Sequence, residues 1–82
     1  MPTVLRFNGL DIRIYPNDHS PAHVHAVGGG KSAVFNLNCP AGPIELRENH
    51  GFSRKEVTLI KRNLLANISK LCEEWSRIHG QP

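Results

Sequence analysis

The dipeptide Asn8-Gly9 constrains the fold most strongly, because it stands between two short segments in which apolar and polar residues alternate. Asn-Gly readily takes positive φ at both turn centres, so it favours a two-residue type I′ hairpin. The register that follows pairs Phe7 with Leu10, Arg6 with Asp11, Leu5 with Ile12 and Val4 with Arg13. It predicts one apolar face on the hairpin and an exposed ion pair between Arg6 and Asp11.

Turn-forming residues divide the next part of the chain into further short strands. The loop 17–22 (NDHSPA) precedes a predicted strand over 23–27, and a second strand is predicted over 32–38. The glycines of segment 28–31 (GGGK) lie between these strands, so we interpret the segment as a hairpin turn and not as a phosphate-binding loop. Residues Ile44 to Leu46 predict a short edge strand after the rigid turn CPAGP.

The C-terminal third predicts a single long helix. Ser53 and Glu56 form a capping box, and Phe52 with Val57 suits a hydrophobic staple. Apolar residues then recur at spacings of three and four, at positions 57, 60, 64, 68, 71, 75 and 78. The helical part of this segment, 53–79, begins at about Arg54 after the Ser53 cap and would be about 38 Å long at 1.5 Å per residue. Because that exceeds the length of the sheet it covers, we expect the helix to overhang the sheet, and the overhang could meet a partner chain. Leu65 and Cys72 widen the apolar stripe, either as part of a wide core face or for that contact.

These elements predict one α+β domain over residues 1–82. Its first part, 1–47, is a small antiparallel β-meander made of the hairpin and two or three further strands, and it packs on the long C-terminal helix of 53–79. A domain of 82 residues buries only about 60 to 65% of its unfolded surface. A homodimer through the helix or the sheet edge is therefore a natural supplement to its stability.

Charge and cysteine usage restrict the class of protein only moderately. Ten Lys or Arg against seven Asp or Glu give a net charge of +3, which is too small to indicate a nucleic-acid binder by itself. Cys39 and Cys72 form no C-x-x-C pair, so we expect reduced structural thiols. The alternating N-terminal sequence contains no continuous apolar segment, which predicts a cytoplasmic protein without signal peptide or membrane association.

Histidines are concentrated in the segment from Asn17 to His25 (NDHSPAHVH). If Val24 points into the core, His23 and His25 project from the opposite face, with their Cβ atoms about 6 to 7 Å apart. The same polar face should carry Arg13, Tyr15 and Asn36. A site on this face therefore requires Val24 to be buried in the core.

Three interpretations of this segment stay open. Exposed histidines beside an Asx turn at Asn17 and Asp18 need no function. His23 and His25 could hold a divalent ion such as zinc, nickel or copper, with Asp18, His19 or, across the fold, His50 as a third ligand. Alternatively, His19, His23 and His25 could act as acids and bases on a phosphodiester, with Arg13 and Tyr15 as anion-binding groups.

A second basic cluster lies on the first half of the predicted helix. It consists of Arg54, Lys55, Lys61 and Arg62. These side chains could contact phosphates of a nucleic acid, or they could simply form the solvated face of the helix.

The chain resembles a bacterial family known as domain of unknown function 4160. The resemblance rests on the opening MPTVLR, the motif N-D-H-x-P-x-H-V-H over residues 17–25, the segment NHGFS at 49–53, and Trp75 with His79-Gly80. It differs from the family pattern by Ala22 where proline is usual, by Ala26 where valine is common and by His50 where arginine is frequent. The last difference weakens a role for His50 as a ligand.

The resemblance implies a compact prokaryotic domain that acts with a small protein partner encoded nearby, in a toxin–antitoxin-like pair. We therefore expect a partner-binding module that uses its histidine-bearing sheet face. The alternatives are a toxin that acts on nucleic acid by ribonuclease-like chemistry, and a small histidine-ligated metal protein.

Overall fold

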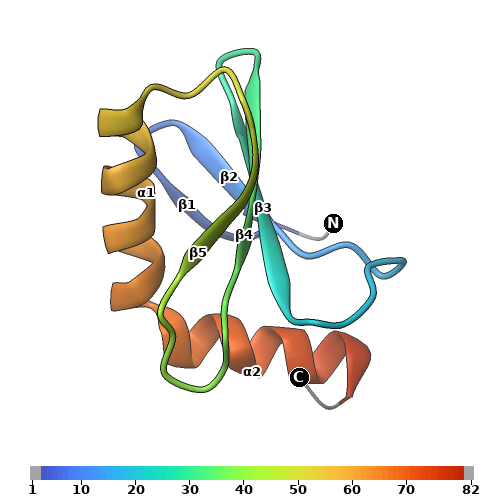
Figure 1. The fold of residues 1–82 in the computed structure, drawn as a ribbon. Helices are drawn as coiled ribbons and strands as arrows, with labels where there is room; N and C mark the ends of the chain where they lie inside the picture. The colour runs from blue at the N-terminus through green and yellow to red at the C-terminus, as the bar shows by residue number, and fades with distance from the viewer. Residues whose placement is uncertain (1–2, 81–82) are drawn as a thin grey trace.

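The computed structural model describes residues 3–80, so the first two residues of the MPTVLR opening and the last two of the predicted domain 1–82 lie outside the described residues. Five strands form one antiparallel sheet in chain order: β1 (Thr3–Phe7), β2 (Leu10–Arg13), β3 (His23–Gly28), β4 (Lys31–Asn36) and β5 (Glu45–His50). Two helices follow, α1 (Arg54–Ala66) and α2 (Ile68–His79). Helix α1 lies along one face of the sheet, and α2 runs across its lower end (Figure 1). The predicted α+β class is confirmed.

The first hairpin forms as its turn predicts. Asn8 and Gly9 have φ values of 51° and 76°, which agree with a type I′ turn. Three of the four predicted strand pairs are present, and Arg6 Nε lies 3.0 Å from Asp11 Oδ1. The fourth pair is wrong, because a register shift between Thr3 and Leu5 places Thr3, and not Val4, opposite Arg13.

The sheet has a longer last strand than the sequence indicates. Strand β5 continues to His50, beyond the predicted Ile44 to Leu46 and beyond the predicted end of the meander at residue 47. All six of its residues are exposed, so it shows no alternation of apolar and polar positions from which a strand is recognised. The segment 28–31 is a hairpin turn, as predicted, with Gly28 opposite Lys31.

The prediction of one long helix is wrong, because the helix breaks at Asn67. The Asn67 side chain donates from Nδ2 to the carbonyl of Asn63 at 2.8 Å, while its backbone N–H donates to the carbonyl of Leu64. An asparagine side chain competes in this way with the helical backbone bond to the residue four positions earlier. The predicted capping box of Ser53 and Glu56 is present. Helix α2 packs under the sheet end, so the expected overhang does not exist (Figure 1).

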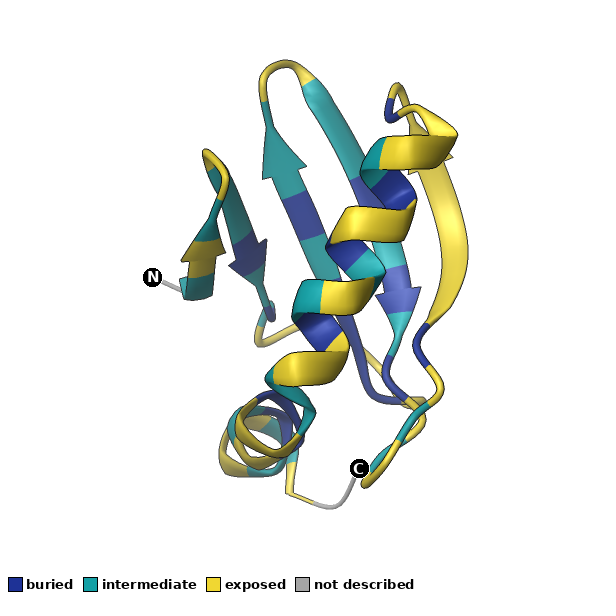
Figure 2. Cartoon of the chain, turned by 90° about the vertical axis from the view of Figure 1, so that its left-hand side faces the viewer, coloured by how far each residue is buried: buried dark blue, intermediate teal, exposed yellow. Residues whose placement is uncertain are grey.

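The core lies between the sheet and the two helices, where the buried segments face one another (Figure 2). Its largest fully buried side chains are Trp75, Phe35, Ile12, Ile14, Leu37, Leu64, Leu71 and Val24. Among residues 3–80 no helix is both long and apolar enough to cross a membrane.

The expectation of two reduced thiols is corrected, because Cys39 and Cys72 form a disulfide with their Cα atoms 5.9 Å apart. The break at Asn67 is the physical reason, since it turns α2 toward the loop that follows β4 and so brings Cys72 to Cys39. The bond ties the lower end of the sheet to the second helix.

Candidate metal centre

Asp18 is held in place by the backbone at the start of its loop. The Asp18 N–H donates to the carbonyl of Tyr15 at 3.0 Å, and the Tyr15 N–H donates to Asp18 Oδ2 at 2.9 Å. This reciprocal pair closes a tight turn directly after Ile14, a core residue. The carboxylate is therefore positioned by the main chain and points back toward the sheet.

The strand phase on which the site depends is the predicted one, since Val24 and Ala26 are fully buried in the core. His25 consequently points to the other face, where 24% of its side chain is exposed. Its Nε2 lies 3.1 Å and 3.2 Å from the two oxygens of Asp18. The Tyr15 ring and the imidazole pack in a T-shaped arrangement, with their centroids 4.8 Å apart.

His23, which we expected to be exposed beside His25, is buried, with only 7% of its side chain accessible. The physical reason is Trp75 of α2, whose ring lies 5.2 Å from the imidazole. Nδ1 of His23 lies 2.8 Å from the carbonyl oxygen of Pro21. Because a carbonyl only accepts, this nitrogen carries the proton and donates it, and Nε2 is the atom left facing Asp18.

Three donor atoms thus converge, one each from Asp18, His23 and His25, all within 4.8 Å of one another. Asp18 Oδ1 lies 3.5 Å from His23 Nε2 and 3.1 Å from His25 Nε2. Ligands bound tetrahedrally at 2.0 to 2.1 Å are separated by about 3.3 Å, so both distances suit a shared ion. In neutral His23 the Nε2 lone pair faces a carboxylate oxygen, an arrangement that needs a proton or a cation between the two atoms.

The electrostatics keep Asp18 ionised. Burial raises the pKa of this carboxyl, but the Tyr15 N–H and the neighbouring His25 and His23 outweigh it, so the pKa lies below its ordinary value. At neutral pH the cluster therefore presents one negative charge and two imidazole rings, which is a donor set that divalent transition metals prefer.

A hollow of about 280 Å³ opens above these donors. Its lining residues are Asn17, Asp18, His19, Ser20, His23, His25, Val34, Arg47 and Glu48. His19 is exposed on the rim and does not belong to the converging trio. Arg47 and Glu48 come from β5. The sequence analysis did not place them at the site, because the predicted strand ended before them. An antiparallel meander in which this last strand is longer would place the residues after Leu46 beside β4, and that continuation was the available signal.

The predicted anion-binding residues separate into two groups. Arg13 lies opposite His25 in the sheet, where its guanidinium donates to Asp11 at 3.1 Å and to the Tyr15 hydroxyl at 3.3 Å. These contacts raise the pKa of Arg13, with the Tyr15 bond as the largest cause, and hold the group beside the site. Asn36 shares this face, opposite His23.

The second group does not reach the histidines. Helix α1, which carries Arg54, Lys55, Lys61 and Arg62, packs on the core face of the sheet (Figures 1 and 2). His50 is also outside the trio, since it lies exposed with Nε2 at 3.3 Å from Glu48. The histidine face thus has Arg13 and Arg47 as its nearby cations.

The comparisons with known proteins give one family. A family model described as Domain of unknown function (DUF4160) matches residues 9–76, which is most of the chain and includes the whole histidine segment. No curated protein and no solved structure matches. The chain belongs to the family of this model.

Proposed function

We propose that this member of the DUF4160 family is a small metal-binding protein, which holds one divalent transition-metal ion between Asp18, His23 and His25. The observation that carries the proposal is the convergence of these three donors from a loop and a strand. Two imidazoles and one carboxylate at these separations are a ligand set for zinc, nickel, copper or iron.

The contacts around the trio support metal binding over simple packing. Metal-bound histidines usually donate their second ring N–H to a carbonyl or carboxylate, which fixes the ring and the tautomer. His23 makes this contact with the Pro21 carbonyl, and the Tyr15 N–H orients Asp18 in the same manner. If His25 and Asp18 formed only a hydrogen bond, His23 would have no reason to point at the same oxygen of Asp18, as it does.

Zinc fits best among the candidates. Three protein ligands with a fourth position open to solvent are typical of zinc sites that bind water or a substrate, whereas structural sites have four protein ligands. The hollow above the trio leaves room for that fourth ligand. When bound, zinc would supply Lewis acidity at this position.

Metal analysis of untagged protein tests the proposal. Protein stripped with a chelator should take up about one equivalent of zinc, measured by elemental analysis and by calorimetric titration. Removing a metal-orienting contact alone weakens binding by about 10- to 100-fold, so Asp18→Asn and His25→Ala should each weaken it by at least that factor. His50→Ala is the matched control, because His50 is an exposed histidine outside the trio and should leave affinity unchanged.

Two results would overturn the proposal. The first is the absence of stoichiometric uptake of zinc, nickel, copper or iron by the wild type. The second is uptake that Asp18→Asn and His25→Ala leave unaltered. In either case the trio would be a hydrogen-bonded anchor for the loop. The toxin–antitoxin context, the partner encoded nearby, and the acid–base roles of His19, His23 and His25 on nucleic acid stay predictions.

A further inference from the structure

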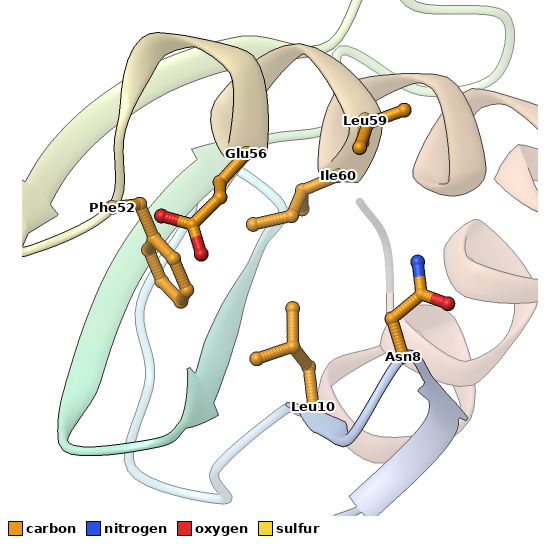
Figure 3. A pocket seen from close by; sticks show the side chains of 6 residues that line it. All are labelled: Asn8, Leu10, Phe52, Glu56, Leu59 and Ile60. Atoms are coloured by element: carbon orange, nitrogen blue, oxygen red, sulfur yellow. The ribbon is translucent and has the colours of Figure 1, made fainter.

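An apolar hollow lies on the other side of the molecule, between the first hairpin and α1. It has a volume of about 290 Å³ and is lined by Asn8, Leu10, Phe52, Glu56, Leu59 and Ile60. Leu10 points from the hairpin toward Ile60, and Phe52 stands beside the opening (Figure 3). The hollow is large enough to receive one or two apolar side chains and has few polar groups to hold water.

Leu59 extends the apolar surface out of this hollow. It is 38% exposed, although the next residue, Ile60, is almost completely buried. Covering a leucine at the rim of an apolar hollow with another apolar group is favourable, because it removes apolar surface from water. Leu59 and the other residues that line the hollow therefore form one continuous apolar groove, which is suited to hold an apolar side chain of a partner.

Positive charge lies along one side of this surface, on the flank of Leu59 away from the hollow. Lys55 and Arg62 stand four residues before and three residues after Leu59, so on the helix they are its neighbours one turn earlier and one turn later on the same side. Both are exposed, and within residues 3–80 neither makes an ion pair. The single carboxylate on α1, Glu56, is already engaged with Lys31 at 3.0 Å.

We propose that this groove docks an acidic amphipathic helix of a partner protein. One apolar side chain of the partner enters the hollow beside Leu59, and carboxylates on the partner's flanks meet Lys55 and Arg62. This is the helix-in-groove mode, in which anchors at spacings of three and four give affinity and charge selects the partner. Contacts to nucleic-acid phosphates would use the cations but leave Leu59 and the hollow uncovered, so a protein helix fits the surface better.

The groove is independent of the metal centre. Its residues come from α1, the segment before it and the first hairpin, whereas the histidine trio lies on the opposite sheet face. Failure of metal binding would therefore leave the docking proposal intact.

A set of designed peptides tests the proposal on the whole chain. The probe is an acidic helix of about five turns, 18 residues, with Leu, Ile or Phe anchors at spacings of three and four and Glu elsewhere. One comparison peptide has Ser at the anchors, a second has Lys in place of Glu, and a single-stranded RNA oligonucleotide supplies charge alone. Binding is measured by fluorescence anisotropy and mapped by amide chemical shifts in labelled protein.

The acidic apolar peptide should bind and shift the amides of Leu10, Phe52 and Leu59. Leu59→Ser and Arg62→Glu should each weaken binding at least 10-fold, and both sites are exposed, so folding should be retained. Ile78→Ser and Lys70→Glu are the controls on α2 and should have no effect, since Ile78 is 37% exposed and thus comparable to Leu59.

Three results would overturn the proposal. If none of the acidic apolar peptides binds, the groove is not a docking site. If the Ser-anchored peptide or the RNA binds as tightly, the surface recognises charge alone. If Ile78→Ser weakens binding as much as Leu59→Ser, the peptide is attracted to any exposed apolar residue.

Discussion

His23 is the most buried side chain of the trio, and its ring lies 5.2 Å from the rings of both Trp75 and His25. The alternation around Val24 correctly predicts which side chains enter the core, because strand period is a local property. The burial of His23 depends on Trp75, a residue of a distant helix, and no local pattern indicates that contact. The donors of the trio were therefore predictable as a group, while their exposure was not.

Glu56 gives a prediction about pH at the same scale. Its pKa is lowered first by the Ser53 N–H and then by the Lys31 ammonium. A folded pKa below the unfolded value contributes stability that is complete above the unfolded pKa and is lost as the pH falls through the folded pKa. The wild type should therefore be more stable than Glu56→Gln at pH 7, and the difference should shrink as the pH falls below 4.5, the ordinary pKa of a glutamate.

Urea unfolding of both proteins at several pH values measures this difference. Glu73→Gln, a change at an exposed carboxylate on α2, serves as the control for a general loss of negative charge. A gap between wild type and Glu56→Gln that stays constant down to pH 3 would contradict the prediction.

At the level of elements, the turns and caps that have a strong local sequence pattern were predicted correctly, whereas a break inside a helix, which has no such pattern, was not. The Asn8-Gly9 turn and the Ser53 capping box each specify geometry within a few residues, and both are present. The break at Asn67 escaped prediction because the apolar spacing continues from Leu64 through Ile68 without interruption. Periodicity reports which residues are buried, but it does not reveal that the helix axis changes direction.

Adjacent leucines on α1 provide a test of its packing. Leu64 is fully buried, whereas Leu65 is about half exposed. Leu64→Ala should lower the free energy of unfolding by about 2 to 5 kcal/mol, because it leaves a cavity in the core. Leu65→Ala should change the free energy of unfolding much less, by about 0.5 kcal/mol, as is usual at surface positions. Equal losses in chemical unfolding experiments would show that α1 does not pack with the described face inward.

For the whole molecule, the disulfide and α2 close the lower end of the sheet. Cys39 and Cys72 are 33 residues apart in the chain, and their pairing required knowledge of how α2 is placed. The same placement brings His79 to the Tyr15 carbonyl, with Nε2 at 3.1 Å, so the last helix also supports the start of the Asp18 turn. Long-range contacts of this kind are the part of the fold that sequence patterns could not predict.

Removing this cross-link should have a large effect in so small a domain. With a separation of 33 residues, loss of the bond should lower stability by about 4 kcal/mol if it acts mainly on the unfolded chain. The measurement compares urea unfolding of the air-oxidised wild type with that of the Cys39→Ser/Cys72→Ser variant. Titration of two free thiols in the oxidised native protein would contradict the disulfide itself.

Trp75 is the one tryptophan in the chain, and its ring lies 5.2 Å from His23 and 4.1 Å from His79. All indole emission therefore originates beside the innermost histidine of the trio. A paramagnetic ion such as Cu²⁺ seated on His23 would quench that emission, while diamagnetic Zn²⁺ would shift it without extinguishing it. Tryptophan fluorescence of the unlabelled protein would thus report an ion bound at the point where the sheet meets the last helix, and would distinguish Cu²⁺ from Zn²⁺.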